Sequence, residues 1–270
     1  METLISIILP VFNGEAYVGD AIKSVISQTH ARWELLVVND GSTDRTKDVV
    51  HAFSDVRIRY FEHQNKGVSA SRNVGLENMR GDFFCFLDAD DLLPSNSLKA
   101  RFDIFRINPA VEFVDGRVEI ETLSTGVLLR TYLPVYRGNP FRKLLKISSE
   151  CFFGSTWMIR RRPDYPYRMN GSLTHCEDFL FFLELAQREG LYDFTTECIL
   201  RCRKRSDSAM SNLTGLDKGY RQVFKIIQSW PQVTVGDKLF YWMKSRKIMF
   251  LSYFFNQKSP RKAFLSLLKF

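Results

Sequence analysis

Two aspartates, one residue apart, follow an apolar run near residue 90. The run Phe83–Leu87 has the length and composition of a buried strand, and Asp88, Ala89 and Asp90 come directly after it. In an extended segment, positions i and i+2 point to the same side, so both carboxylates can face one ligand. Carboxylate oxygens suit Mg²⁺ or Mn²⁺, and such an ion would neutralise a diphosphate leaving group. Taken alone, such a pair is a weak signal and is more often an acidic turn without a ligand.

A further carboxylate, Asp40, ends another apolar run and precedes Gly-Ser-Thr-Asp. A carboxylate at this point can accept a hydrogen bond from the imide N–H of a uracil ring. The alternative is an acid that stabilises the next helix, and Asp44 fits that role better, with Ser42 as the expected N-cap. Farther along, Gly67 permits a close backbone approach, and Arg72 can bind the nucleotide or the acidic cluster. That last run could also be the start of an ordinary helix.

Two more acids, Glu177 and Asp178, open the predicted helix Glu177–Arg188. The helix dipole favours acids in a first turn, so this position needs no catalytic role. A reaction in which an acceptor hydroxyl attacks a carbon atom, however, needs a base that deprotonates that hydroxyl. A carboxylate at the start of a helix in the second half of the chain is a candidate for that base.

The elements that must position these residues are clearest in the first ninety residues. Apolar, β-branched runs at 4–11, 33–39, 58–61 and 82–87 alternate with helical patterns, which predicts a parallel sheet buried on both faces. Ligands of such sheets bind beyond the carboxyl ends of the strands, where the acidic residues concentrate. Acidic clusters that converge there need a cation or hydrogen-bond donors between them, because like charges repel.

The rest of the chain predicts a mixed second part and a helical third part. We divide it into a nucleotide-sugar-binding part (1–100), a part with the acceptor site and catalytic base (101–216), and a basic, aromatic helical extension (217–270). The second part predicts helices at 95–108 and 141–146, short strands within 113–132, and a strand at 157–160. The extension predicts amphipathic helices interrupted near Pro231 and Pro260.

The extension also carries the basicity of the chain. Residues 217–270 hold eleven Lys/Arg against two Asp. The full chain has a net charge of +8, so residues 1–216 are nearly neutral. Basic residues mixed with aromatic ones suit an anionic membrane surface, although solvated faces of ordinary helices are an equal alternative. A homodimer could instead form through this part, and nucleic acid is not an expected partner. The aromatic side chains available for a dimer are Phe240, Trp242, Phe250, Phe254 and Phe255.

The cysteines and apolar runs predict a cytoplasmic protein. The five cysteines are odd in number and irregularly spaced, which favours reduced thiols. The N-terminus lacks the pattern of a signal peptide, and the run Ile248–Phe255 is far shorter than the roughly 20 residues that a spanning helix needs. If the extension binds lipid, the protein would be peripheral on the inner face of the plasma membrane.

Taken together, these motifs resemble the family 2 glycosyltransferases in order and spacing. The resemblance is dense over residues 1–100, sparser to about 212 and absent beyond. It implies an α/β GT-A fold, with a mainly parallel central sheet flanked by helices, and an inverting enzyme that uses a nucleotide-sugar. The segments that carry it are Ser6-Ile-Ile-Leu-Pro-Val-Phe-Asn13, Val37-Val-Asn-Asp-Gly-Ser-Thr-Asp44, Asn65-Lys-Gly-Val-Ser-Ala-Ser-Arg-Asn-Val-Gly75, Phe86-Leu-Asp-Ala-Asp-Asp91 and Glu177-Asp178.

The resemblance also implies a role for each matching residue. Asp178 would be the catalytic base and Glu177 would help position the acceptor. Asp90 would coordinate the metal, and Asp88 would touch the metal or the ribose. The remaining nucleotide-binding residues would be Pro10, Val11 and Phe12 as the floor of the base pocket, Glu15 and Asp40 on ribose or base, and Gly67, Arg72 and Ala89 along the nucleotide.

The sequence departs from the family pattern at two positions. Phe12 stands where the family often has Tyr, so a hydroxyl contact is lost while the ring remains. Arg205 stands where a histidine can serve as a further metal ligand, and a protonated arginine binds phosphate instead. We therefore expect Mn²⁺ or Mg²⁺ to be held by Asp90 and the nucleotide, with Arg203 and Arg205 assisting the diphosphate.

The expected reaction is transfer of a hexose or N-acetylhexosamine from a UDP-sugar to a saccharide hydroxyl. A lipid-linked saccharide acceptor, as in bacterial surface polysaccharide assembly, would suit a basic, aromatic extension. Two rivals are a nucleotidyltransferase and a non-catalytic sugar-nucleotide binder. The first usually has a Gly-rich basic loop after strand one, where this chain has Asn13-Gly14-Glu15, and the intact acidic pairs weigh against the second.

Overall fold

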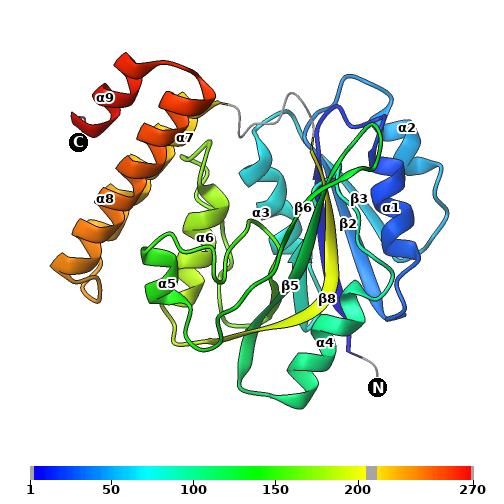
Figure 1. The fold of residues 1–270 in the computed structure, drawn as a ribbon. Helices are drawn as coiled ribbons and strands as arrows, with labels where there is room; N and C mark the ends of the chain where they lie inside the picture. The colour runs from blue at the N-terminus through cyan, green and yellow to red at the C-terminus, as the bar shows by residue number, and fades with distance from the viewer. Residues whose placement is uncertain (1–2, 205–211, 269–270) are drawn as a thin grey trace.

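The computed structural model describes residues 3–204 and 212–268, built around a single twisted sheet (Figure 1). The strand order is β3-β2-β1-β4-β7-β5-β6, and β8 pairs with β5. The four predicted strands of the first part are confirmed, and they run parallel to one another. They are β1 (Ile5–Val11), β2 (Trp33–Asn39), β3 (Ile58–Glu62) and β4 (Phe83–Phe86).

The second part extends this sheet with two short strands, β6 and β7, and two long ones, β5 and β8. β7 (Met158–Arg160) lies antiparallel to β4, and β5 (Val111–Thr122) lies antiparallel to β7 and to β6 (Leu128–Tyr132). Along its other edge, β5 pairs in parallel with β8 (Leu191–Lys204) over its whole length, with three shifts of register. The sequence did not predict β8, because its bulges break the alternation of apolar and polar residues.

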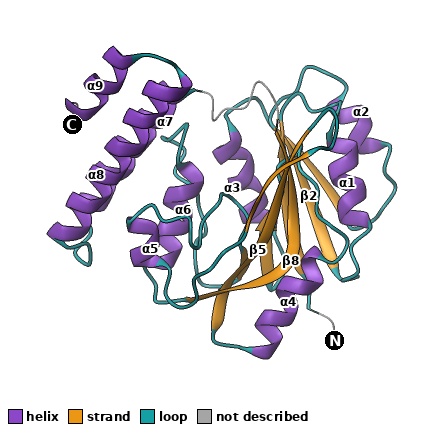
Figure 2. Ribbon diagram, viewed as in Figure 1, coloured by secondary structure: helices purple, strands orange, loops and turns teal. Residues whose placement is uncertain are grey.

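Helices cover both faces of the sheet, as continuous apolar strands require (Figure 2). Consecutive residues of β1 belong to opposite cores: Ile8 packs on one side, and Ile7 and Leu9 pack on the other. The first core takes side chains from α3 (Val68–Asn78), α5 (Phe141–Leu145) and α6 (Glu177–Ala186). The second takes them from α1 (Val18–Ile26), α2 (Thr46–His51) and α4 (Ser97–Ile107).

The extension packs beside α5 and α6, on the side of the molecule away from α1 (Figure 1). Its elements are α7 (Leu213–Gln228), α8 (Val235–Leu251), the π-helical turn η2 (Ser252–Asn256) and α9 (Pro260–Leu268). The predicted interruptions near Pro231 and Pro260 are thus confirmed. Among the described residues, no helix has the length and apolar composition needed to cross a membrane.

The three-part division of the chain stays a prediction. Its boundary at residue 100 falls inside α4, and its boundary at residue 216 falls inside α7. The first two parts share one sheet, and α7 begins within the segment assigned to the second part.

A glycine sets how closely α3 approaches the sheet, and its substitution tests that packing. A Cβ on Gly75 would lie 2.3 Å from Cγ2 of Ile8 in β1. Alanine in a helix normally stabilises by about 0.5–1 kcal/mol over glycine, but overpacking a core costs about 1–3 kcal/mol. We expect Gly75→Ala to lower the free energy of unfolding in urea, whereas Gly154→Ala, with open space around it, should not. Equal stability of both variants would contradict this packing.

Candidate functional site

The loops that follow β1 and β2 interlock at the carboxyl edge of the sheet. The backbone N–H of Asn13 donates to Oγ of Ser42 at 2.9 Å, and Oδ1 of Asn13 accepts from the N–H of Thr43. Oε2 of Glu15 accepts from the N–H of Arg45 at 2.8 Å. The expectation that Ser42 caps a helix is therefore wrong, because α2 begins only at Thr46 and the Ser42 hydroxyl serves the neighbouring loop.

Asp44 occupies the turn before α2. Its Oδ1 accepts from the backbone N–H of Thr46 at 3.0 Å, and its Oδ2 accepts from the N–H of Glu15. The acid that serves the start of this helix is thus Asp44, as the sequence favoured. Asp40 instead accepts hydrogen bonds from the segment before α3.

Asp40 joins the end of β2 to the start of α3. Its two carboxylate oxygens accept from the backbone N–H groups of Lys66 and Gly67, at 2.8 and 2.9 Å. Gly67 has φ of +87°, a left-handed conformation that glycine adopts without a steric penalty. A carboxylate has about four lone-pair sites, so these bonds leave acceptor capacity for a nucleobase. That contact stays a prediction.

Three residues at the end of β1 form an apolar surface beside this junction. Pro10 and Val11 are buried, whereas the ring of Phe12 is 50% exposed. An exposed phenyl ring next to buried apolar residues offers a face on which a planar base can stack.

Arg72 brings the two acidic motifs together. This buried side chain of α3 places Nη2 2.8 Å from Oδ1 of Asp88 and Nη1 3.8 Å from Oε1 of Glu177. Burial opposes its charge, but Asp88, Asp178 and Glu177 outweigh burial and raise the pKa of Arg72. A permanent positive charge therefore lies between the loop after β4 and the first turn of α6, which are almost ninety residues apart in the chain.

The carboxylates of Glu177 and Asp178, in the first turn of α6, are partly buried rather than exposed. Burial is the largest cause that raises the pKa of both Glu177 and Asp178, and Arg72 opposes the rise in each case. Oδ1 of Asp178 also accepts from the N–H of Phe179 at 2.6 Å. Carboxyls whose pKa is perturbed by burial and one specific charge are candidates for functional groups.

Arg203, near the end of β8, binds the acidic loop that follows β4. The backbone N–H of Arg203 donates to Oδ1 of Asp91 at 2.9 Å, and its Nε donates to the carbonyl oxygen of Asp90. Its Nη1 lies 3.4 Å from Oδ2 of Asp20. Arg203 thus has protein partners here, and its predicted contact with a diphosphate stays a prediction. Arg205 lies outside the described residues.

Sequence reasoning missed Asp91, which directly follows the predicted metal ligands. Burial, and then Asp88 and Asp90, raise the pKa of Asp91 well above its ordinary range. Its position before the apolar pair Leu92-Leu93 was the available signal, because a carboxylate there must turn inward and needs a donor.

The donor set fits a divalent ion that arrives with a nucleotide. Within the described ranges, no group of three or more His, Cys, Asp or Glu side chains is arranged to hold a metal. Asp88 is paired with Arg72, and the buried Asp91 accepts from Arg203. Magnesium is often bound by only one or two carboxylates, with water and substrate phosphates as its other ligands. Asp90 and Asp88 match that arrangement, with Ala89 between them.

Comparison with known proteins identifies the family. Residues 6–167, more than half of the chain, match the model of Glycosyl transferase family 2. The chain belongs to this family. It is a glycosyltransferase, as the order of its motifs indicated.

Relatives match over different shares of their length. An uncharacterised glycosyltransferase of Haemophilus influenzae is 29% identical over 221 residues, which cover 76% of this chain and 82% of that protein. The Escherichia coli UDP-Glc:alpha-D-GlcNAc-diphosphoundecaprenol beta-1,3-glucosyltransferase WfgD is 29% identical over 217 residues. These residues cover 78% of this chain and 81% of WfgD. A Rickettsia conorii glycosyltransferase is 42% identical, but over only 38% of this chain and 17% of its own length.

Solved structures bear out the GT-A fold of the glycosyltransferase. S. aureus TarS 1–349 in complex with UDP-GlcNAc superposes with a TM-score of 0.73 at 18% identity, covering 98% of this chain and 78% of TarS. The mannosyltransferase PcManGT of Pyrobaculum calidifontis, in complex with GDP-Man and Mn²⁺, superposes with a TM-score of 0.67 at 16% identity. The superposition covers 99% of this chain and 75% of PcManGT.

The raised pKa of Asp178 predicts a stability that depends on pH. A carboxyl whose folded pKa exceeds its unfolded value of about 3.9 stabilises the fold at low pH, and this is lost as pH rises through the folded pKa. Asparagine cannot ionise, so Asp178→Asn should be more stable than the wild type at pH 7, by a margin that shrinks toward pH 4.

Asp55 is the matched control, because its hydrogen bond to Arg57 lowers the pKa of that carboxyl. Asp55→Asn should therefore lose stability at pH 7, and this loss should disappear in acid. Urea unfolding across this pH range measures both variants. A loss of stability in Asp178→Asn at pH 7 would contradict the assignment.

Proposed function

We propose that this glycosyltransferase moves a hexose or N-acetylhexosamine from a UDP-sugar to a saccharide hydroxyl, with inversion at the anomeric carbon. The observation that carries the proposal is the position of Arg72 between Asp88 and Glu177. It joins a loop suited to a nucleotide diphosphate to a carboxylate pair suited to a base. The UDP-GlcNAc bound by TarS and the UDP-Glc named for WfgD support a UDP-sugar as donor.

The donor would lie across the carboxyl ends of β1, β2 and β4. Pro10, Val11 and Phe12 would carry the base, with Asp40 and Glu15 contacting base or ribose, and Gly67 allowing the nucleotide to approach the backbone. Mn²⁺ or Mg²⁺, once bound with the nucleotide by Asp90, would neutralise the charge that develops on the departing UDP. Arg203 and Arg205 would add positive charge near the diphosphate.

Asp178 would act as the base. Its carboxylate would take the proton of the acceptor hydroxyl while the acceptor oxygen attacks the anomeric carbon from the side opposite UDP. The bond from that carbon to the diphosphate oxygen would break, and UDP would leave with the electron pair. Burial raises the pKa of Asp178, which makes its carboxylate a stronger base, and the charge of Arg72 opposes that rise. Glu177, beside it, would orient the acceptor.

Two substitutions separate these roles. Asp178→Asn should lower UDP release by about 10²–10⁴-fold, the usual contribution of a general base, and leave UDP binding unchanged. Asp90→Ala should weaken UDP binding in the presence of Mn²⁺, by more than the about 10–100-fold that loss of an outer-shell partner costs a metal site. Calorimetry with UDP, with and without Mn²⁺, and UDP release across a panel of sugar nucleotides make the two measurements.

The exposed acid Asp164 is the control, since Asp164→Asn removes one charge from a surface turn. Near-normal turnover of Asp178→Asn with an acceptor that the wild type uses would overturn the assignment of the base. Equal loss of UDP binding in both variants would overturn the division of roles.

We also propose that the acceptor is lipid-linked and that α8 and α9 rest on an anionic membrane surface. Phe240, Met243, Lys247 and Leu251 recur every three or four residues and are exposed, so they form one open face of α8. Phe254 follows about one turn later. Exposed aromatic residues with lysines beside them suit the interface of an anionic bilayer. The diphosphoundecaprenol acceptor named for WfgD supports a lipid-linked substrate.

The membrane proposal predicts vesicle binding that depends on the exposed aromatics. Phe255 and Phe264 are 66% and 60% exposed, so serine at both positions should not disturb the fold. Burying one aromatic side chain contributes about 1.5–3 kcal/mol, so the double variant should bind at least about tenfold more weakly. Co-sedimentation would compare vesicles of phosphatidylcholine alone with vesicles that also contain phosphatidylglycerol.

Ile107→Ser is the control, because Ile107 is an exposed apolar residue at the end of α4. Binding without a preference for phosphatidylglycerol would overturn the proposal. A stable dimer in light scattering, lost in the double variant, would assign the surface to a second copy instead.

A further inference from the structure

We infer that α7 positions the catalytic carboxylates through two glycines, Gly215 and Gly219. The inference rests on the proposed role of Glu177 and Asp178 and deepens it. Residues four apart lie on the same face of a helix, so both glycines face one neighbour. That neighbour is the segment His175-Cys176, which leads directly into the two carboxylates of α6.

Gly219 meets the backbone of this segment. A Cβ on Gly219 would lie 2.5 Å from the carbonyl oxygen of His175 and 3.1 Å from Sγ of Cys176. A carbonyl oxygen cannot turn away as a flexible side chain can. Any side chain at position 219 must therefore push α7 and the start of α6 apart.

Gly215 meets a side chain instead. A Cβ on Gly215 would lie 2.2 Å from Cε1 of His175, with both ring nitrogens within 2.7 Å. The imidazole therefore lies flat against the backbone of α7. The two glycines differ in what they accommodate, a ring in one case and the main chain in the other.

The segment under this contact has a conformation that needs support. Cys176, the residue before Glu177, has φ of +62° and ψ of +17°, in the left-handed region. This conformation costs a residue with a side chain roughly 1–2 kcal/mol, and no side chain in the described part of the chain caps the helix there. Cys176 packs against the first core and against a smaller cluster of the extension that contains Leu213, Leu216 and Met249. Surrounding structure, with α7 as part of it, must hold such a residue in place.

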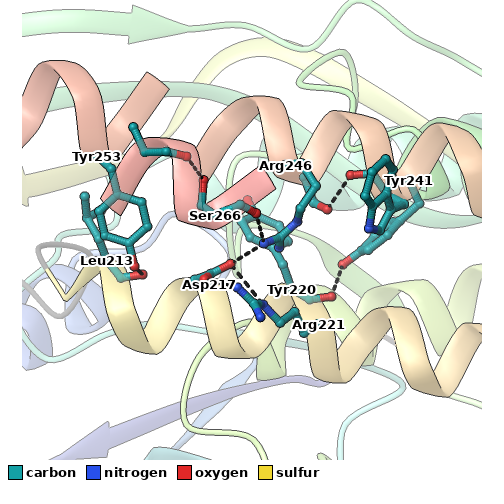
Figure 3. Close-up of polar contacts among 11 residues, drawn as sticks. Leu213, Asp217, Tyr220, Arg221, Tyr241, Arg246, Tyr253 and Ser266 are labelled. Carbon is teal, nitrogen blue, oxygen red and sulfur yellow. Dashed lines mark hydrogen bonds and ion pairs between the residues drawn. The ribbon is translucent and has the colours of Figure 1, made fainter. Parts of the chain in front are cut away.

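Two other helices of the extension, α8 and α9, hold α7 in place through buried polar contacts (Figure 3). Arg246 of α8, only 3% exposed, donates from Nη1 to Oδ1 of Asp217 in α7 at 2.6 Å and to the carbonyl oxygen of Ser266 in α9 at 3.0 Å. One guanidinium thus joins three helices. The hydroxyl of Tyr241 also donates to the carbonyl oxygen of Tyr220, one residue after Gly219.

The same network reaches the first turn of α6. The ring of Tyr241 lies 6.4 Å from that of Phe179, the residue after Asp178, and Tyr241 is fully buried. The extension therefore contacts the segment on both sides of the carboxylate pair. A displacement of about 1 Å in a catalytic group can cost about 10²-fold in rate, so this contact should govern turnover.

The test uses the full-length chain and exploits the difference between the two glycines. Gly215→Ala and Gly219→Ala should each lower kcat for UDP release by about 10–100-fold and leave KM for the UDP-sugar within about twofold, because the donor site lies elsewhere. Adding His175→Ala should restore kcat in Gly215→Ala, since it removes the obstructing ring. It should not restore Gly219→Ala, because alanine keeps the carbonyl oxygen at residue 175.

Hydrogen exchange supplies a reading that does not depend on activity. In the wild type, the N–H of Leu180 donates to the carbonyl oxygen of Cys176 at 2.9 Å, so its exchange should be slow. Both glycine variants should speed exchange at this first turn of α6. Gly236→Ala is the matched control in α8, since a Cβ there meets only Thr234, at 3.8 Å.

Each result has a defined meaning. Slow exchange and normal kcat in both glycine variants would overturn the inference, and so would full rescue of Gly219→Ala by His175→Ala. If Gly219→Ala fails to fold, the Gly215→Ala pair with and without His175→Ala decides. If the wild type releases UDP from no sugar nucleotide, the proposed function fails, while exchange at Leu180 still tests the contact with α7.

Discussion

The buried guanidinium of Arg72 is the interaction on which the site depends. The carboxyl ends of parallel strands gather acidic loops at one edge of the sheet, and those loops repel one another unless positive groups separate them. Arg72 contacts Asp88 directly and lies within reach of Glu177, and Asp178 contributes to its raised pKa. A lysine could not replace it easily, because only the guanidinium presents donors to two carboxylates in fixed directions.

Backbone N–H groups hold the remaining carboxylates. Asp40 takes two N–H groups from the start of α3, and Asp91 takes one from Arg203 in β8. These bonds fix the loops without using further charged side chains. The protein's own groups thus offset part of the local negative charge, while the side chain of Asp88 stays 46% exposed and accessible to the diphosphate and ion proposed above.

The sequence predicted what depends on local signals and missed what depends on distant pairing. Strands β1 to β4 were foreseeable because each is a continuous apolar run followed by polar residues. β8 was not, because its bulges and its charged residues make sense only once β5 lies beside it. For the same reason the bond from Arg203 to Asp91 could not be predicted. The misassigned cap at Ser42 arose because a contact with Asn13, from another loop, replaced the local one.

The basic residues of the extension do not all face solvent. Its excess of basic residues suggested a surface for an anionic partner, yet Arg246 is buried and serves to join α7, α8 and α9. The lysines and arginines that remain on the surface, such as Lys247 and Arg261, are those that a membrane could meet. The same three helices thus present one face outward and another to the segment before Glu177. Because α7 meets that segment through the backbone of Gly215 and Gly219, the extension and the start of α6 pack directly against each other.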